Sequence, residues 1–169
     1  MKYLITGNLG YIGPVLAKFL KNKDRDCEIT GYDIGYFQNC EIGSEMEGMP
    51  PYIDKQIYGD VRDSQKITKY IEKSDHIIHL AAISNDPMGK EFEKVTFEIN
   101  RDSSVFIAKK AIEKGCKSFV FASSCSVYGS GSDSPRTEED QINPLTAYAK
   151  SKIETENIIF SFDWGFGVL

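Results

Sequence analysis

Short runs of consecutive apolar residues alternate along the chain with longer stretches in which apolar residues recur every three or four positions. The short runs predict strands, four of them clear and two weaker; they cover residues 2–6, 28–32, 76–80 and 118–122, then 56–58 and 166–169. The longer stretches predict helices over residues 11–22, 64–73, 91–114 and 146–160. Strands without inside–outside alternation are typical of a parallel sheet with helices on both faces. The pattern therefore predicts an α/β fold with a doubly wound parallel sheet of the Rossmann type.

Three predicted loops are longer than a simple connection requires, and they cover residues 34–54, 83–90 and 124–145. By strand order all three follow the carboxyl ends of strands, where open parallel sheets bind their ligands. The functional site is therefore expected there. The stretch 129–143, rich in Gly, Ser, Asp and Pro, also has the composition of an inert surface loop.

Composition fits one globular domain over residues 1–169, because 41% of the residues are hydrophobic and 27% are charged. The formal net charge is −5 and the 20 basic residues form no run, which argues against a nucleic-acid partner. No apolar stretch approaches the ~20 residues that cross a bilayer, and the N-terminus enters a strand pattern at once. We therefore expect a cytoplasmic protein that does not enter a membrane.

Cysteine and histidine positions give no sign of a disulfide framework or a metal centre. The four cysteines contain no CxxC pair and are expected to be reduced thiols; they are Cys27, Cys40, Cys116 and Cys125. His76 and His79 are three residues apart in a predicted strand, so their side chains point to opposite faces of the sheet. No metal site is expected from the pair.

A glycine pattern of the form GxxGxxG follows the first strand and opens the first helix, with glycines at Gly7, Gly10 and Gly13. Glycine permits a tight turn, close approach of the backbone to a pyrophosphate, and close packing of helix on strand, while the helix N-terminus attracts the anion. Pro14 fits an early helical position, where its missing N–H costs little. The alternative interpretation is an ordinary strand–helix turn.

Asp33 stands twenty residues after Gly13, at the end of the second strand. A carboxylate at this position can accept hydrogen bonds from the hydroxyls of an adenosine ribose, and it would repel a 2′-phosphate. Residues 34–37 supply no arginine to hold such a phosphate, so NAD is favoured over NADP. The alternative is a solvated aspartate in a turn.

Tyr148 and Lys152 form a YxxxK pair that is expected by chance in a chain of this composition, so its position carries the argument. The pair opens a helix after the fifth strand and follows the serine-rich segment 123–129. Residues i and i+4 share a helix face, which puts the ammonium beside the phenol and makes Tyr148 a usable base. Ser124, near the carboxyl end of the fifth strand, would hydrogen-bond the same substrate oxygen. Lys150 and Ser151 turn away from that face and receive no role.

These motifs resemble the extended short-chain dehydrogenase/reductase family, in its NAD-dependent nucleotide-sugar epimerase/dehydratase branch. The resemblance rests on GxxGxxG in place of GxGxxG, on Gly59-Asp60-Val61 after the third strand, on His79-Leu80-Ala81-Ala82, and on Asn100, which stands where members of the family carry an asparagine in their fourth helix. It covers essentially the whole chain. It implies contacts with NAD from a set of residues that share these motifs: Gly7, Gly10, Tyr11, Ile12, Gly13, Asp33, Asp60, Val61, Leu80, Ala81, Ala82, Asn100, Tyr148 and Lys152.

Within that family, the segments 124–129 and 143–148 resemble those of nucleotide-sugar epimerases. The resemblance implies that Tyr148 removes a proton from a sugar hydroxyl while a hydride leaves the same carbon for NAD, and that the hydride returns to the opposite face. Ser84, Asn85 and Asp86 are candidate contacts to the sugar.

A nucleotide-sugar dehydratase ranks lower, because such enzymes carry an Asp-Glu pair where this chain has Cys125 and Ser126. An NAD-dependent reductase or dehydrogenase stays open, since the hydride need not return. A non-catalytic dinucleotide-binding module is disfavoured because Tyr148 and Lys152 are both present.

The helices at 91–114 and 146–160 resemble the two that form a four-helix dimer interface in the family, which implies a homodimer; alternatively, they only cover the sheet. Proteins of the family are longer than 169 residues, and the strand at 166–169 stops before any following helix. We therefore expect the C-terminal substrate domain to be absent from this chain. By itself the chain would bind NAD weakly, associate with itself and show no turnover.

Overall fold

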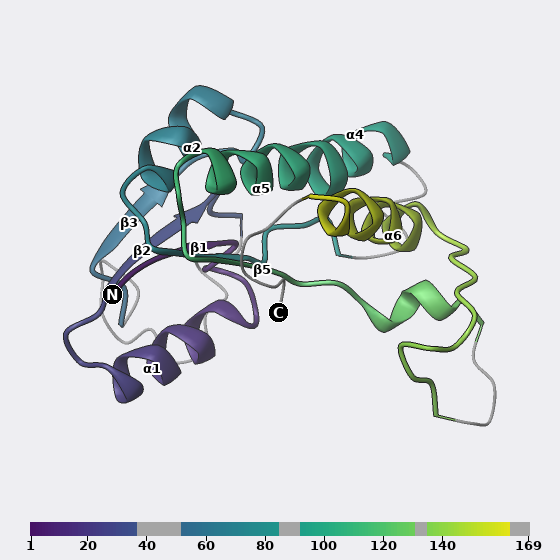
Figure 1. The fold of residues 1–169 in the computed structure, drawn as a ribbon, viewed down its shortest axis with the longest axis horizontal. Helices are drawn as coiled ribbons and strands as arrows, with labels where there is room; N and C mark the ends of the chain where they lie inside the picture. Colours follow the sequence, from purple (N-terminus) through teal and green to yellow (C-terminus); the bar gives the residue numbers. More distant parts are fainter. Residues whose placement is uncertain (37–51, 85–91, 131–134, 163–169) are drawn as a thin grey trace.

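The centre of the computed structural model, which describes residues 1–36, 52–84, 92–130 and 135–162, is a five-stranded parallel sheet (Figure 1). Its strands are β1 (Lys2–Thr6), β2 (Glu28–Asp33), β3 (Lys55–Tyr58), β4 (His76–His79) and β5 (Ser118–Phe121). They lie in the order β3-β2-β1-β4-β5, and every neighbouring pair is parallel. The chain reverses its direction of winding at β1, so the carboxyl ends of β1 and β4 flank the topological switch point. The predicted α/β fold of the Rossmann type is confirmed.

The helices lie on both faces of this sheet, as expected for a doubly wound fold (Figure 1). They are α1 (Gly13–Lys23), α2 (Ser64–Ile71), α4 (Glu93–Phe97), α5 (Ser104–Glu113) and α6 (Ala147–Phe160), with a π-helix, η1 (Glu98–Ser103), between α4 and α5 and a 3₁₀-helix, η2 (Cys125–Tyr128), after β5. In Figure 1, α1 lies below the sheet, and α2, α4, α5 and α6 lie above it. The site at the ends of the strands is therefore framed by helices of both layers.

The predicted helices differ from the observed ones by one or two residues at several ends, and two differences bear on the site. The first helix begins at Gly13, so Tyr11 and Ile12 precede it, and Pro14 occupies an early position as expected. The helix predicted over 91–114 includes the π-helix η1. A π turn contains an extra residue that apolar periodicity does not reveal, because the apolar positions on either side still fit a helical repeat.

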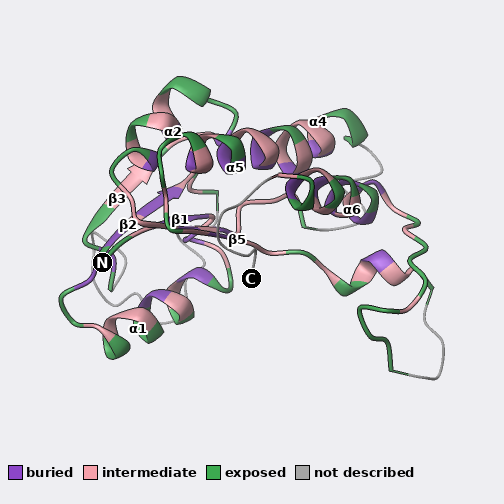
Figure 2. Cartoon of the chain, in the orientation of Figure 1, coloured by how far each residue is buried: buried purple, intermediate pink, exposed green. Residues whose placement is uncertain are grey.

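Two apolar clusters form the core, one on each face of the sheet (Figure 2). The larger cluster joins β1, β4 and β5 to α2, α5 and α6, and its fully buried side chains include Leu4, Ile67, Ile77, Ile107 and Ile159. The smaller cluster joins β1 and β2 to α1 and comprises Ile5, Ala17, Cys27, Ile29 and Ile53. Leu4 and Ile5, which are successive residues of β1, thus belong to clusters on opposite faces, as a strand buried on both faces requires.

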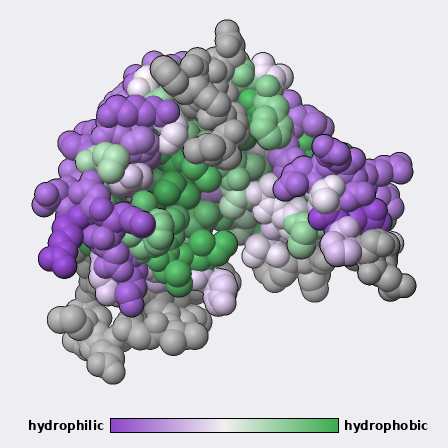
Figure 3. Space-filling view, turned by 60° about the horizontal axis from the view of Figure 1, so that its bottom comes forward, coloured by the Kyte–Doolittle hydropathy of each residue, from purple (hydrophilic) through white to green (hydrophobic). Residues whose placement is uncertain are grey.

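Exposed apolar side chains gather on the face that carries α1. Val15 and Phe19 of α1 are 71% and 55% exposed, and Tyr11 and Ile12 just before the helix are 94% and 54% exposed. Figure 3, turned so that this side comes forward, shows a hydrophobic patch in the middle of the face with hydrophilic side chains on either side. Among the helices that the structure describes, α1 alone lies on this face, whereas α2, α4, α5 and α6 lie on the other.

Some predictions concern residues outside the described part of the chain, namely the strand at 166–169, Cys40, Asn85 and Asp86. The three described cysteines, Cys27, Cys116 and Cys125, are free thiols, as expected. His76 stacks on Tyr3, whereas His79 stacks on Phe119 and Phe121 on the other side of the sheet. Among the described helices, none is long and apolar enough to span a bilayer.

Gly13 sets how closely α1 packs against the turn that precedes it. A Cβ at this position would lie 2.1 Å from the carbonyl oxygen of Asn8, which is backbone and cannot rotate away. We expect Gly13→Ala to lower the free energy of unfolding by about 2 kcal/mol or more. The matched control is Val15→Ala on the exposed side of α1, which should change stability by less than about 0.5 kcal/mol. Urea denaturation of both variants measures this, and equal stabilities would contradict the packing described here.

Candidate functional site

The turn after β1 lies directly against the segment that leaves β4. Gly7 has a φ of +71°, and a Cβ there would lie 2.5 Å from the backbone nitrogen of Ala81. Its N–H donates to the carbonyl of Tyr32 at 2.9 Å, and the N–H of Gly10 donates back to the Gly7 carbonyl at 3.1 Å. Only glycine combines this φ with this close approach. Residues 80–82 are therefore held beside the glycine turn, as the sequence predicted for a common site.

A pair of side-chain amides, which the sequence analysis missed, connects the same turn to β3. Asn8 is 1% exposed; its Nδ2 donates to Oε1 of Gln56 at 2.7 Å, and Nε2 of Gln56 donates back at 3.3 Å. Gly31 in β2 leaves room for this pair, because a Cβ there would lie 2.4 Å from the Asn8 amide. The one available signal was a glycine in the middle of an apolar strand, which often marks a close approach.

The N-terminus of α1 has free backbone donors. Its N-cap, Ile12, makes no side-chain hydrogen bond to the helix, and no acidic residue lies in the first turn. In contrast, α2 is capped by the Asp63 carboxylate and α6 by the Thr146 hydroxyl. The first N–H groups of a helix without a cap are available to an anion, and the helix dipole favours negative charge there. The predicted phosphate loop thus has the local geometry that a pyrophosphate needs.

Asp33 closes the other side of this turn. Its Oδ2 accepts the N–H of Leu9 at 3.1 Å and its Oδ1 accepts the N–H of Gly35 at 2.8 Å. A carboxylate has about four acceptor positions, so about two remain for a ligand. The carboxylate at the end of β2 is therefore tied to the glycine turn and still able to bind the two hydroxyls of a ribose.

Asp60 and Val61 follow β3, where the sequence placed an adenine contact. The Asp60 carboxylate accepts Nε of Arg62 at 3.1 Å and Nη2 at 2.6 Å, and this guanidinium holds the pKa of Asp60 below its usual value. The Asp60 carbonyl accepts the hydroxyl of Tyr32 at 3.0 Å, and burial raises the pKa of Tyr32 to about 12. Arg62 is a partner that the sequence analysis did not single out. Val61 is 7% exposed and lies in the larger core cluster.

Asn100 uses both ends of its amide within the protein. Its Oδ1 accepts the N–H of Ile83 at 2.8 Å, while its Nδ2 donates to the Ile83 carbonyl at 2.9 Å and to Oγ of Ser151 at 3.2 Å. This amide holds the backbone three residues beyond Leu80, so Asn100 shapes the predicted nicotinamide side of the site through Ile83. Direct contact of Asn100 with a cofactor stays a prediction. Ser151, for which the sequence predicted no role, is fully buried and connects α6 to the Asn100 amide.

Lys152 and Tyr148 lie together on α6, as their spacing predicted. The Lys152 ammonium is 5.7 Å from the centroid of the Tyr148 ring and 4.6 Å from that of Phe121. Its Nζ donates to the carbonyl of Ala122 at 2.7 Å, just after β5. The residue is 2% exposed, and this burial lowers the pKa of Lys152 to about 8, which the carboxylate of Glu156 opposes. A buried cation thus lies beside a phenol ring of intermediate exposure.

Ser124 lies two residues beyond Ala122, at the start of η2. Its Oγ accepts the N–H of Ser126 at 3.2 Å and lies 2.9 Å from Oγ of Ser126. Across the described residues, no hydrogen bond joins Ser124 to Tyr148. The structure therefore brings Lys152 and Tyr148 together and anchors Lys152 at the end of β5. Ser124 lies on the segment that follows β5, and its hydroxyl bonds to Ser126.

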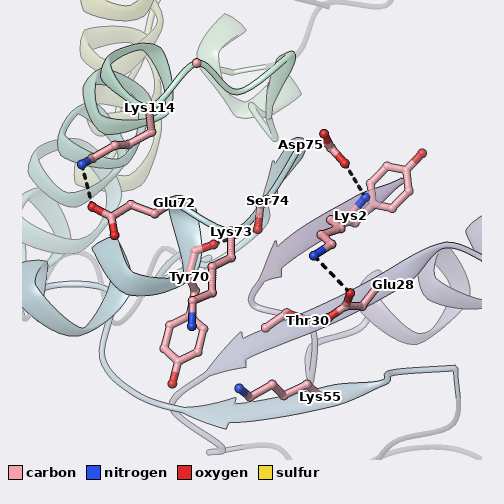
Figure 4. A pocket seen from close by; sticks show the side chains of 12 residues that line it. Lys2, Glu28, Thr30, Lys55, Tyr70, Glu72, Lys73, Ser74, Asp75 and Lys114 are labelled. Atoms are coloured by element: carbon pink, nitrogen blue, oxygen red, sulfur yellow. Dashed lines mark hydrogen bonds and ion pairs between the residues drawn. The ribbon is translucent and has the colours of Figure 1, made fainter.

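A cavity of about 500 Å³ lies elsewhere, at the amino-terminal edge of the sheet (Figure 4). None of the predicted site residues lines it. Its charged side chains include two ion pairs, Lys2 with Glu28 at 3.7 Å and Lys114 with Glu72 at 2.6 Å. This polar hollow is separate from the carboxyl ends of the strands, where the predicted site lies.

Residues 3–168 match the model of the NAD dependent epimerase/dehydratase family. The chain belongs to this family. Among curated relatives, UDP-arabinose 4-epimerase 1 of Arabidopsis thaliana is 26% identical over 94% of this chain and 38% of its own length. UDP-glucose 4-epimerase of Vibrio cholerae is 31% identical over 90% of this chain and 44% of its own length. The chain thus spans less than half the length of these relatives.

Solved structures support the fold of this epimerase/dehydratase family member. Pal from Bacillus thuringiensis aligns with a TM-score of 0.84 and 26% identity, over 100% of this chain and 54% of that protein. A UDP-glucose 4-epimerase from Thermus thermophilus, solved as a complex with NAD, aligns with a TM-score of 0.81 and 24% identity, over 99% and 52%. Family membership and the glycine turn together identify the carboxyl edge of the sheet as the place to test for NAD.

The buried ammonium of Lys152 should make stability depend on pH in this family member. The pKa of Lys152 is about 8 in the folded protein and 10.5 for an ordinary lysine, so between pH 8 and 10.5 the unfolded chain holds the proton and the folded chain does not. The free energy of unfolding of the wild type therefore increases as the pH rises from 8 to 10.5. The interval corresponds to roughly 3 kcal/mol.

Urea denaturation at pH 7.5 and pH 10.5 should therefore show the stability of the wild type, measured relative to Lys152→Met, rising by about that amount. Lys150→Met on the exposed side of α6 is the matched control and should show no such change. If the difference in free energy of unfolding between the wild type and Lys152→Met were the same at both pH values, the ammonium would be solvated.

Proposed function

We propose that this chain is the NAD-binding and catalytic part of an enzyme that epimerises a nucleotide sugar through a transient keto intermediate. The observation that carries the proposal is the pairing of the Tyr148 ring with the buried Lys152 ammonium beside β5, in a chain that also holds a glycine turn and Asp33. Curated relatives named as UDP-arabinose and UDP-glucose 4-epimerases support the substrate class.

The cofactor half of the proposal rests on a fit between the residues and NAD. The pyrophosphate would lie at the N-terminus of α1, against Gly10 to Gly13, and the adenosine ribose on the free acceptor positions of Asp33. The nicotinamide half would lie near Leu80 to Ala82, a segment that contacts the Gly7 turn and whose following residue, Ile83, is held by the Asn100 amide. Bound NAD would take a hydride from the sugar carbon and return it.

Tyr148 would take the proton from the sugar hydroxyl. Its phenolate would be stabilised by the Lys152 ammonium, because the two side chains share one helix face and the site has a low local dielectric. Lys152 donates one of its three N–H groups to Ala122, which leaves two for the cofactor or substrate. With a pKa of about 8, this lysine can exchange its proton near neutral pH.

Ser124 would donate to, or accept from, the same sugar oxygen as it changes between hydroxyl and carbonyl. The Ser126 hydroxyl at 2.9 Å orients it. Where a dehydratase needs a second acid and base, this chain has Cys125 and Ser126, so epimerisation is favoured over elimination of water. A dehydrogenase would release NADH and a reductase would consume it, whereas an epimerase would do neither in net turnover.

Assembly and location are further parts of the proposal. We expect a homodimer through the helical segment predicted at 91–114, which comprises α4, η1 and α5, and through α6. We also expect a cytoplasmic enzyme whose sugar is held in part by a C-terminal domain. The chain by itself should then bind NAD more weakly than the whole enzyme does and show no turnover, because the sugar must be held within about 3 to 3.5 Å of the reacting atom.

Binding of NAD and NADP to this chain tests the cofactor. We expect NAD to bind at least tenfold more tightly in calorimetric titrations, because the Asp33 carboxylate would repel a 2′-phosphate; this ratio corresponds to about 1.4 kcal/mol. Asp33→Asn keeps the shape and removes the charge, so the preference should shrink. Equal affinities of the wild type for NAD and NADP would contradict the proposed contact of Asp33 with the adenosine ribose.

Replacement of the proposed base tests the chemistry. In the protein in its complete natural form, Tyr148→Phe should lower kcat on a converted UDP-sugar by about 100-fold or more, while NAD affinity changes little. Tyr3→Phe, remote from the site at the start of β1, is the control. Product analysis over a panel of UDP-sugars, with the formation or consumption of NADH measured, separates epimerisation from net oxidation or reduction of the sugar. Near-normal turnover of Tyr148→Phe would refute the assigned role.

A further inference from the structure

His79 is a fully buried titratable side chain that the proposed chemistry does not use. It ends β4 and lies opposite Thr6, the last residue of β1, in the register of the sheet. Its ring stacks at 6.1 Å from Phe119 and 6.2 Å from Phe121, and Phe121 is the ring that contacts the Lys152 ammonium. The imidazole therefore lies between the glycine turn and the catalytic helix.

The hydrogen bonds around His79 determine which of its nitrogens carries the proton. Ser104 donates its only hydroxyl proton to the Asn100 carbonyl at 2.7 Å, so at 2.7 Å from Nε2 it can only accept. Nε2 is therefore protonated. Burial lowers the pKa of His79 to about 3, with a contribution from the Lys152 charge, so the ring is neutral and Nδ1 accepts the Thr6 hydroxyl at 2.6 Å. Thr6 in turn accepts the N–H of Ala81 at 3.4 Å.

This chain of hydrogen bonds continues into α6. The Asn100 amide donates to Oγ of Ser151 at 3.2 Å. The single hydroxyl proton of Thr155 is directed to the Ser151 carbonyl at 2.7 Å, with the Asn100 carbonyl at 3.1 Å as a second, longer acceptor. Ser151 then donates to the carbonyl of Tyr148 at 2.7 Å. The side chains that form these links are buried, so water cannot replace a lost partner among them without a rearrangement; they are Thr6, His79, Asn100, Ser104, Ser151 and Thr155. The bonds at the two ends, to Ala81 and to the Tyr148 carbonyl, are partly buried.

We propose that His79 is a positioning residue that holds α6, and with it Tyr148 and Lys152, in a fixed relation to the glycine turn after β1. The imidazole is suited to this because it places one acceptor and one donor on opposite sides of a rigid ring, between a threonine and a serine hydroxyl. Only the NAD-binding measurement described below depends on the proposed function. The hydrogen-exchange measurement tests the role of His79 whether or not the proposed function holds.

Two variants break the chain on either side of His79. Thr6→Val removes the donor to Nδ1 without changing shape, and Ser104→Ala removes the acceptor of Nε2. Each should speed amide exchange in α6 by about fivefold, the effect of one lost hydrogen bond, while α2 exchanges as in the wild type. If both act through His79, the double variant should exchange about as fast as one single variant.

Controls separate positioning from general destabilisation. Thr6→Ser retains the hydroxyl and should restore slow exchange in α6. His76→Leu removes a histidine from the same strand, on the other face, where it contacts Ser118 at 2.8 Å, and should leave the ratio of α6 to α2 exchange unchanged. Nitrogen-15 shifts of the His79 ring should show Nε2 protonated in the wild type and altered in Thr6→Val.

The outcomes distinguish the two proposals. NAD should bind about fivefold more weakly to Ser104→Ala, although Ser104 lies in the helix layer and not in the glycine turn. Equal acceleration of α2 and α6, or additive effects in the double variant, would overturn the positioning role of His79. Failure of the wild type to bind NAD would overturn the proposed function and leave the exchange result to decide on His79.

Discussion

The close contact between Gly7 and Ala81 is the constraint on which the site depends. With no Cβ on Gly7, the turn after β1 reaches the backbone of the segment that leaves β4, and the two strands flanking the switch point end side by side. The remaining contacts at this edge build on that approach. The Asp33 carboxylate bonds to Leu9 in the same turn, and Thr6 meets His79 one residue before it. A larger residue at position 7 would separate the strand ends and disconnect the two halves of the site.

The sequence predicted those parts of the fold and site that local patterns determine. The strands, the glycine turn and the Tyr148–Lys152 pair follow from period, spacing and helix geometry, which involve residues at most about ten apart. The amide pair of Asn8 and Gln56 joins residues 48 apart, and the bond from Thr6 to His79 joins residues 73 apart. Such pairings depend on the register of the sheet, which a single sequence does not determine.

Burial of Lys152 illustrates how a functional group is held at a cost in stability. The ammonium has lost most of its water, and in return it has one carbonyl and two aromatic rings. This environment lowers its affinity for the proton, which is unfavourable for folding; in the proposed site it would help to move protons at neutral pH. The packing of α6 against β5 imposes this burial on Lys152.

The π-helix η1 makes the chain sensitive to a change in its length between Glu98 and Ser103. Each residue of an α-helix turns the following ones by about 100°, so loss of one residue here would let the segment wind as ordinary α-helix and rotate everything before it relative to α5. Asn100 could then no longer face Ile83 and Ser151 together. Substitutions on the outer face of this helix should accumulate freely during evolution, whereas a single-codon deletion within it should be eliminated by selection.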